Sequence, residues 1–168
     1  MIKIISKDPV LSKIRLLSCD VDGVLTDGGL YYDDEGKELR RFHVLDGLGI
    51  QMLQRAGIHV CIITQSTAKA IEYRAERLGI KFCYMGVENK LNCMKSLLSK
   101  LNLSLKDVAH VGDDLNDQQL LQSVGVPITV QNGIPTIMKQ CRFVTTKTGG
   151  NGAVREIIDS ILASIGDL

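Results

Sequence analysis

The sequence is poor in aromatic residues and contains no tryptophan: Phe, Trp and Tyr together make up 4% of its 168 residues. Proteins that bind single-stranded nucleic acid stack bases on aromatic side chains, so this function is disfavoured. An excess of one charge is also missing, since 20 Lys and Arg residues stand against 19 Asp and Glu residues. The charge balance therefore gives no reason to expect nucleic acid or an anionic membrane as a partner.

Long apolar runs are absent as well. No run exceeds four residues, as in Val60–Ile63 and Phe82–Met85, whereas a membrane-spanning helix needs about 20. Apolar residues still make up 45% of the chain and charged residues 23%, which excludes a disordered chain. At this length we expect residues 1–168 to form one domain with a sizeable buried core.

Paired cysteine spacings are missing too. The chain has five cysteines, Cys19, Cys61, Cys83, Cys93 and Cys141, an odd number with no C-x-x-C pair. Zinc sites and disulfide frameworks use paired spacings, so neither is expected. We expect buried, reduced thiols in a protein of the cytoplasm.

Short apolar runs alternate with helical patterns along the chain. The predicted strands are Ile14–Cys19, Ile58–Thr64, Phe82–Met85, Val108–Val111, Val126–Val130 and Phe143–Thr145. Helical patterns cover Leu48–Leu53, Ala68–Leu78, Leu91–Leu101, Leu115–Val124, Ile134–Lys139 and Ala153–Ile165. The runs Leu30–Tyr32 and Leu39–Val44 flank a polar turn, which predicts a β-hairpin over about residues 27–43. This alternation predicts an α/β fold, a three-layer, doubly wound parallel sheet of Rossmann-like type.

Polar side chains follow four of the predicted strands. Asp20 and Asp22 come directly after the first strand, and Gly23 beside them permits a tight turn. Thr64 ends the second strand, and Lys90 opens the helix after the third. The fourth strand is followed by three aspartates, Asp113, Asp114 and Asp117. Parallel sheets bind ligands beyond the carboxyl ends of their strands, so these groups are expected at one rim.

Clustered carboxylates repel one another unless a cation lies between them. Oxygen ligands suit a hard ion, and Mg²⁺ bound by carboxylates commonly retains waters and a phosphate oxygen. Lys90 and the Thr64 hydroxyl are placed to hold further phosphate oxygens. One aspartate of the Asp20–Asp22 pair would then attack phosphorus, while the other protonates the leaving alkoxide and activates water.

These residues carry a resemblance to a known family. The segment Asp-x-Asp-Gly-Val-Leu-Thr-Asp-Gly from Asp20, with Thr64, Lys90 and Gly112-Asp113-Asp114, resembles the four motifs of the haloacid dehalogenase superfamily phosphatases. The hairpin, the segment Asp46–Ile50 and the tail Gly149–Glu156 are similar to those of the 3-deoxy-D-manno-octulosonate 8-phosphate phosphatases and related sialic-acid-type enzymes. The resemblance runs from about residue 14 to the end of the chain.

The resemblance implies a role for each matching residue. Asp20 would be the nucleophile and a metal ligand, and Asp22 the acid/base that also lends its backbone carbonyl to Mg²⁺. Asp113 would be a further metal ligand, supported by Asp114 and Asp117. Phosphate or substrate would be bound by Thr64, Gln65, Lys90, Asp46, Gly47 and Asn151. The family lacks a cap domain and forms homotetramers in which the hairpin and tail help to close a neighbour's site.

The sequence departs from the family pattern at two places. The octulosonate enzymes usually have Thr-Gly-Arg after the second strand, where this chain has Thr64-Gln65-Ser66. Their tail usually reads Gly-Gly-Arg-Gly, where this chain has Asn151 in place of the arginine. Both changes remove cations that could recognise an anionic sugar. The expected substrate is the octulosonate 8-phosphate of lipopolysaccharide biosynthesis, with a nonulosonate 9-phosphate or another small sugar phosphate as the alternative.

Two other functions are compatible with parts of the pattern. A phospho-accepting receiver domain also combines aspartates, a hydroxyl and a lysine, but its acceptor aspartate usually follows the third strand, where this chain has none. A non-catalytic assembly module would usually have lost one of the motif residues. The three histidines, His43, His59 and His110, are expected to be structural. Arg40 and Arg41 are expected on a solvated hairpin face, with a role in holding a substrate carboxylate as the alternative.

Overall fold

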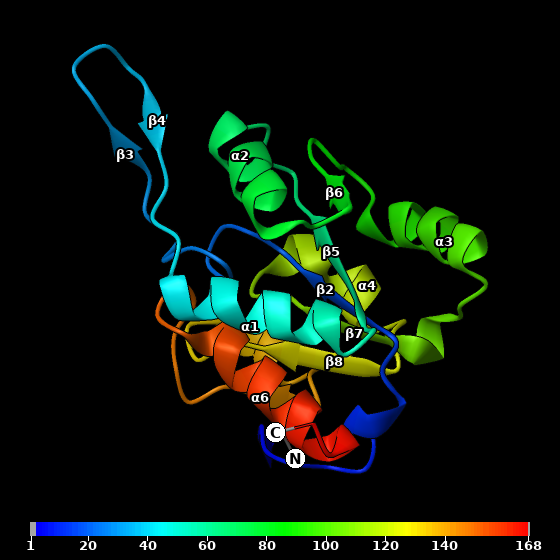
Figure 1. Cartoon of the computed structure of the whole chain (residues 1–168). Helices are drawn as coiled ribbons and strands as arrows, with labels where there is room; N and C mark the ends of the chain where they lie inside the picture. The colour runs from blue at the N-terminus through cyan, green and yellow to red at the C-terminus, as the bar shows by residue number, and fades with distance from the viewer. Residues whose placement is uncertain (1–2, 168) are drawn as a thin grey trace.

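The computed structural model describes residues 3–167 and is built on a parallel sheet (Figure 1). Within these residues the main sheet has seven strands in the order β1-β9-β8-β7-β2-β5-β6, and all neighbours are parallel. The strands are Lys3–Ile4 (β1), Leu16–Cys19 (β2), His59–Ile63 (β5), Phe82–Tyr84 (β6), Val108–Val111 (β7), Val126–Thr129 (β8) and Phe143–Val144 (β9). The prediction of a doubly wound parallel α/β sheet is confirmed.

Helices cover both faces of the sheet. The α-helices are Val44–Arg55 (α1), Lys69–Leu78 (α2), Lys90–Leu101 (α3), Gln118–Leu121 (α4), Pro135–Met138 (α5) and Ala153–Ile165 (α6). Short 3₁₀ turns lie at Leu11–Lys13 (η1), Leu105–Asp107 (η2) and Leu115–Asp117 (η3). One core cluster contains apolar residues of α1, α2 and α6, and a second contains those of α3 and α4. Helices α1 and α6 pack side by side, as Figure 1 shows.

The side chains of the central strands alternate between the two cores. Leu17 of β2 belongs to the first core cluster and its neighbour Leu16 to the second. The same alternation places Ile62 of β5 in the first cluster and Ile63 in the second. Successive side chains of a strand point to opposite faces, so a strand buried on both sides is apolar at every position. This explains why these strands read as continuous apolar runs in the sequence.

The chain reverses its direction across the sheet between β2 and β7. From β2 it proceeds to β5 and β6 on one side, then crosses back to β7, β8 and β9 on the other. Ligands of open parallel sheets bind beyond the carboxyl ends of the strands at such a reversal. The residues after β2 and β7, Asp20 and Asp113, therefore occupy the position where a ligand is expected.

A β-hairpin extends from the body between β2 and α1 (Figure 1). Its strands, Tyr31–Tyr32 (β3) and Glu38–Leu39 (β4), are antiparallel. A single bridge between Thr26 and Phe42 closes its base. The predicted hairpin is present, although its second strand is shorter than Leu39–Val44 because Val44 begins α1.

Three other elements differ from the sequence expectation. Helix α1 covers 12 residues rather than a short segment around Leu48–Leu53. Its glycines at 47 and 49 lie against side chains of α2 and α6, so these buried positions carry no apolar side chain that would signal a helix in the sequence. The segment Leu115–Val124 begins as a 3₁₀ turn, and its α-helix ends at Leu121. Strand β1 was not predicted, since a two-residue strand has no detectable periodicity. Two cysteines, Cys83 and Cys93, are half-buried rather than buried.

None of the helices in residues 3–167 combines the length and the apolar character that crossing a membrane requires.

Replacing Ile158 of α6 with alanine is predicted to lower the free energy of unfolding by about 2–5 kcal/mol, because the side chain is fully buried and lies against Gly49 of α1. Urea denaturation followed by circular dichroism measures the change. Ile165→Ala is the matched control, since that side chain is 38% exposed on the same helix, and should cost less than about 1 kcal/mol. Equal losses in the two variants would contradict the position assigned to α6.

Candidate active site

Asp20 is fixed at the end of β2 by its own backbone. Its amide N–H donates to the carbonyl oxygen of Val111 at 3.0 Å, which continues the ladder between β2 and β7. Its carboxylate Oδ1 accepts from the backbone N–H of Val21 at 2.7 Å. The side chain is buried, so the carboxylate is held in one orientation at the rim of the sheet.

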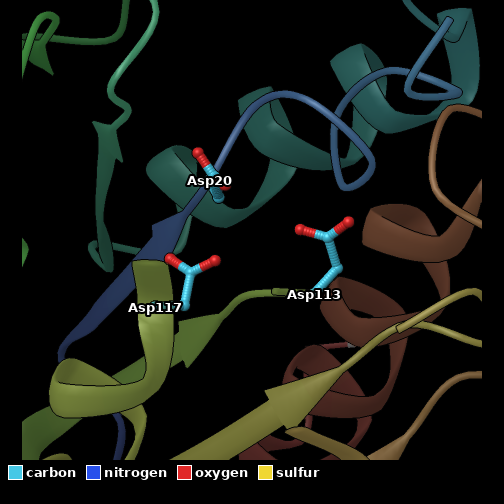
Figure 2. Close-up of side chains that lie close together, drawn as sticks. All are labelled: Asp20, Asp113 and Asp117. Atoms are coloured by element: carbon cyan, nitrogen blue, oxygen red, sulfur yellow. The ribbon is translucent and has the colours of Figure 1, made fainter. Parts of the chain in front are cut away.

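Three carboxylates converge at this rim (Figure 2). Asp20, Asp113 and Asp117 each offer one oxygen, and these oxygens all lie within 4.8 Å of one another. Gly23 makes the approach possible, because an added Cβ at this position would lie 2.0 Å from Asp113 Oδ2 and its φ is +84°. The loop after β2 and the loop after β7 thus meet in a contact that a larger residue would prevent.

Lys90 is the cation at the centre of this cluster. Its buried Nζ lies 3.0 Å from Asp20 Oδ1 and donates to Asp117 Oδ1 at 2.7 Å. His110 Nε2 lies 2.9 Å from the same Asp117 oxygen, and His110 Nδ1 lies 3.1 Å from Ser18 Oγ. The lysine therefore links two of the carboxylates, while the histidine fixes one of them from inside the sheet.

The carboxyls differ in how readily they ionise. Burial, together with the charge of Asp117, raises the pKa of Asp20 to about 6, although Lys90 opposes this. Burial and the charges of Asp20, Asp117 and Asp114 raise the pKa of Asp113 to about 7. Burial opposes ionisation of Asp117 too, but hydrogen bonds and charge from His110 and Lys90 hold its pKa below the usual value. One cation does not balance two buried carboxylates and a half-buried third.

The donor set fits a hard divalent metal ion. All three groups are carboxylates, the ligands that Mg²⁺ prefers. Asp117 Oδ2 is buried and has no hydrogen-bond partner among the described residues, although buried polar atoms are nearly always partnered. A bound cation would complete the coordination of this oxygen and offset the excess negative charge that raises the pKa of Asp113.

A cavity of about 380 Å³ opens beside the carboxylates. It is lined by Asp20, Asp22, Thr64, Gln65, Ser66, Asp113, Asp114, Leu115 and Asn116. Thr64 is buried, and its hydroxyl oxygen accepts from the N–H of Ser66 at 3.2 Å, so the hydroxyl hydrogen remains free to donate. Thr64 and Gln65, both predicted to bind phosphate or substrate, therefore face the same space as Asp20.

Asp22 lines the cavity but lies outside the three-carboxylate cluster. Its two oxygens pair with Arg40 of the hairpin, with Nε to Oδ1 at 2.7 Å and Nη2 to Oδ2 at 3.2 Å. The Arg40 side chain is only 4% exposed, so the prediction that it belongs to a solvated hairpin face is wrong. The neighbouring Arg41 is half-exposed, which agrees with the prediction of a solvated face for this residue.

Several other predicted site residues have local structural roles in the chain. Asp114 is exposed, and its carboxylate accepts from the N–H of Leu115 at 2.7 Å as the N-cap of η3. Asn151 is exposed; its oxygen accepts from Arg41 and its amide donates to Thr148. Asn151 does not line the cavity beside Asp20.

Asp46 and Gly47, predicted to bind substrate, do not reach that cavity within the chain. Asp46 Oδ1 accepts from the N–H of Arg155 at 2.8 Å, so this α1 carboxylate caps the N-terminus of α6. Gly47 lies against Arg74, whose nitrogen would be 2.4 Å from an added Cβ. The geometry of one chain therefore gives both residues a packing role instead of a substrate contact.

Sequence reasoning missed two residues that reach the site. His110 was expected to be only structural, yet it contacts Asp117 at the site. Ser66 contacts Arg40, with Nη2 donating to Oγ at 3.0 Å. The spacing of seven residues between His110 and Asp117 carries no recognisable motif, and the pairing of Arg40 depends on how the hairpin folds back.

Comparisons with known proteins agree with this geometry. A family described as haloacid dehalogenase-like hydrolase matches residues 85–157. The 3-deoxy-D-manno-octulosonate 8-phosphate phosphatase of Escherichia coli K12 is 44% identical over 155 residues, covering 92% of this chain and 82% of that protein.

Two solved structures are similar over nearly the whole chain. The phosphatase of that name from Moraxella catarrhalis, in complex with a magnesium ion, a phosphate ion and a KDO molecule, has a TM-score of 0.92 and 40% identity, covering 94% of this chain and 91% of that one. The cobalt-bound enzyme from Haemophilus influenzae has a TM-score of 0.90 and 34% identity, covering 94% and 92%. By sequence and by fold, the chain belongs to the 3-deoxy-D-manno-octulosonate 8-phosphate phosphatase family of the haloacid dehalogenase-like hydrolases.

Proposed function

We propose that the protein, acting as one domain over residues 1–168, hydrolyses 3-deoxy-D-manno-octulosonate 8-phosphate to the free sugar acid and phosphate with the help of Mg²⁺. The observation that carries this proposal is the convergence of Asp20, Asp113 and Asp117 around Lys90 at the strand reversal, beside an open cavity. The Escherichia coli and Moraxella catarrhalis relatives have this name, and the latter was solved with magnesium, phosphate and the sugar.

In the first step, a carboxylate oxygen of Asp20 attacks phosphorus of the substrate. A new bond joins Asp20 to phosphorus, and the bond from phosphorus to the sugar oxygen breaks, with its electron pair remaining on that oxygen. A proton from Asp22 neutralises the leaving sugar oxygen. Lys90, which contacts Asp20, and the Thr64 hydroxyl, which lines the cavity, hold the phosphoryl oxygens as their negative charge is redistributed.

In the second step, water attacks phosphorus of the aspartyl-phosphate. Asp22, now a carboxylate, takes a proton from the water, and the bond between phosphorus and the Asp20 oxygen breaks. Phosphate leaves, Asp20 regains its carboxylate and Asp22 is protonated again for the next substrate. The pair thus works because Asp20 is fixed by Val21 and Lys90 while Asp22 faces the cavity.

Asp20, Asp113 and the backbone carbonyl of Asp22 would hold Mg²⁺, with Asp117 in support. The ion would supply positive charge to the phosphoryl group and between the carboxylates. Asp117 remains ionised because His110 and Lys90 both contact its Oδ1, so it contributes negative charge even when Asp113 is protonated. Asp114 would contribute only through its charge, since its side chain caps η3.

We further propose a homotetramer in the cytoplasm, without nucleic acid or membrane partners. The five cysteines are all free, which suits a reducing compartment. The hairpin and the start of α1 expose large apolar side chains that a second subunit would cover, namely Leu30, Tyr31, Tyr32, Leu39, Val44, Leu45 and Leu48. In such an assembly the exposed Asn151 would border a neighbour's site, whereas Asp46 and Gly47 are buried in their own subunit.

The function is tested by phosphate release from the octulosonate 8-phosphate and from nonulosonate 9-phosphates, each with Mg²⁺ and with a chelator. We expect Mg²⁺-dependent release with a preference for the octulosonate. A preference for a nonulosonate would retain the chemistry and change the substrate, with Gln65 and Asn151 as the first residues to exchange. No release from any sugar phosphate would favour a non-catalytic assembly module.

Asp20→Asn is predicted to reduce phosphate release at least about 10³-fold, because the amide is a poor nucleophile toward phosphorus. Circular dichroism should show an unchanged fold, since the amide oxygen still accepts from the N–H of Val21. Asp34→Asn, at the exposed tip of the hairpin, is the matched control and should retain turnover. Substantial activity in Asp20→Asn would eliminate this residue as the nucleophile.

The raised pKa values of Asp20, about 6, and Asp113, about 7, predict how pH and Mg²⁺ act together on stability. A carboxyl whose folded-state pKa is raised stabilises the fold at low pH, and this contribution is lost as pH rises through that pKa. The metal-free protein should therefore lose thermal stability as pH rises from about 4, near the unfolded-state pKa of a carboxyl, to about 7. Mg²⁺ should raise the Tm more at the higher pH, because both carboxylates are then ionised.

Thermal unfolding with Mg²⁺ and with a chelator across this pH range measures the effect. Asp113→Asn is the control, since it removes the group with the higher pKa and should flatten the pH dependence. An equal Mg²⁺ effect on Tm at both ends of the range would argue against a metal bound by these carboxyls.

A further inference from the structure

Arg40 connects the hairpin to the reaction site. Although it lies in a segment that extends from the body, its side chain is 4% exposed and its guanidinium faces Asp22 at the edge of the cavity. We propose that Arg40 is a positioning residue for Asp22, so that the hairpin orients the group that exchanges protons with the leaving sugar and with water. This inference rests on the proposed function.

Arg40 and Asp22 form a bidentate contact. Arg40 Nε donates to Asp22 Oδ1 at 2.7 Å and Nη2 donates to Oδ2 at 3.2 Å. A planar guanidinium that binds both oxygens of a carboxylate fixes the plane of that carboxylate as well as its position. A single donor could not do so, because the carboxylate could still rotate about its Cβ–Cγ bond.

The guanidinium is itself anchored on the other side. Its Nη2 donates to Ser66 Oγ at 3.0 Å, and the same oxygen accepts from the N–H of Ala68 at 3.3 Å, at the start of α2. Its Nη1 donates to Glu38 of the same hairpin. Ser66 and Glu38 thus hold Arg40 between the loop after β5 and the hairpin, which leaves the guanidinium little freedom to move with Asp22.

The orientation of the Asp22 carboxyl matters because this group transfers protons in the reaction, and a group that only binds substrate is less sensitive to its orientation. Asp20 is held by the N–H of Val21 and by Lys90, whereas the Asp22 side chain is 35% exposed and hydrogen-bonds to Arg40. When Asp22 is protonated, one oxygen can point its proton toward the leaving oxygen while the other still accepts from Nε. Without the guanidinium, Asp22 would sample several rotamers, and few of them would reach the sugar oxygen.

The same contacts argue against binding of the substrate carboxylate by Arg40. Its donors already face Asp22, Glu38 and Ser66, so two carboxylates balance its single charge. A third carboxylate would have to displace one of these partners. Exposed cations that line the adjoining larger cavity, such as Lys37 and Lys69, could bind a substrate carboxylate without displacing a partner of Arg40.

The test compares kcat/KM of Arg40→Ala with that of the wild type on three substrates. The octulosonate 8-phosphate has a sugar leaving group and a carboxylate, and ribose 5-phosphate has a sugar leaving group alone. With p-nitrophenyl phosphate the leaving group needs no proton, so the role of Asp22 in its departure disappears. We expect kcat/KM to fall about 10–100-fold on both sugar phosphates, because part of the general acid catalysis by Asp22 is lost. On p-nitrophenyl phosphate kcat/KM should fall less than about threefold.

Each other pattern overturns the proposal. A loss confined to the octulosonate would make Arg40 a carboxylate-binding residue, and an equal loss on all three would give it a purely structural role. Arg40→Lys keeps the charge but offers one point of contact, so it should recover the sugar phosphates only in part and retain the substrate pattern. Full recovery would show that charge alone suffices.

Arg41→Ala is the matched control in the hairpin. Arg41 contacts Asp27, the carbonyl of Gly150 and Asn151, and none of its contacts involves Asp22. Any effect of this variant should be the same factor on all three substrates, and a pattern like that of Arg40→Ala would contradict our inference. A wild type that hydrolyses none of the substrates would instead refute the proposed function itself.

Discussion

One buried lysine beside two buried carboxylates and a half-buried third is the interaction on which the site depends. Lys90 contacts Asp20 and Asp117 at the same time, yet its single charge leaves an excess of negative charge around Asp113. Burying carboxylates together is costly unless cations or hydrogen bonds compensate. The pKa of Asp113, raised to about 7, is the sign of this incomplete compensation. A site of this kind is best stabilised when a metal ion and a phosphoryl group are both present.

The sheet brings these charges together at little cost in chain length. Asp20 and Asp113 follow adjacent strands at the reversal of strand order, and Lys90 begins the helix that follows β6. Asp20 follows β2 directly and Asp113 lies two residues after β7, so the hydrogen-bond register of the strands sets their positions. The hairpin contributes Arg40 from outside the sheet. Two classes of element therefore serve the same cavity: rigid strands for the nucleophile and metal ligands, and a hairpin for the acid/base.

Much of this arrangement could be predicted from the residues. The apolar runs predicted β2, β5, β7 and β8 because strands buried on both faces are continuously apolar. The half-buried edge strand β6 was also predicted from its apolar run. Asp20, Asp113 and Lys90 were expected to converge because they follow strands of one parallel sheet, and they do so. Local patterns could not reveal that Asp22 turns toward Arg40, or that Asp46 caps a helix more than a hundred residues further on. Those contacts depend on tertiary packing, which leaves no periodic signal.

The glycines of the tail have a consequence for how this enzyme could change. An added Cβ at Gly149 would lie 1.8 Å from the carbonyl oxygen of Gly23, and one at Gly150 would lie 2.3 Å from the N–H nitrogen of Asp27. Asn132 spans the two loops, donating to the Gly23 carbonyl and accepting from the N–H of Gly149. The backbone of the tail therefore packs directly against the backbone of the loop after β2, and neither Gly149 nor Gly150 can carry a side chain. Asn151 is the next residue along and is exposed, so a different side chain fits at this position, whereas the two glycines leave no room for one.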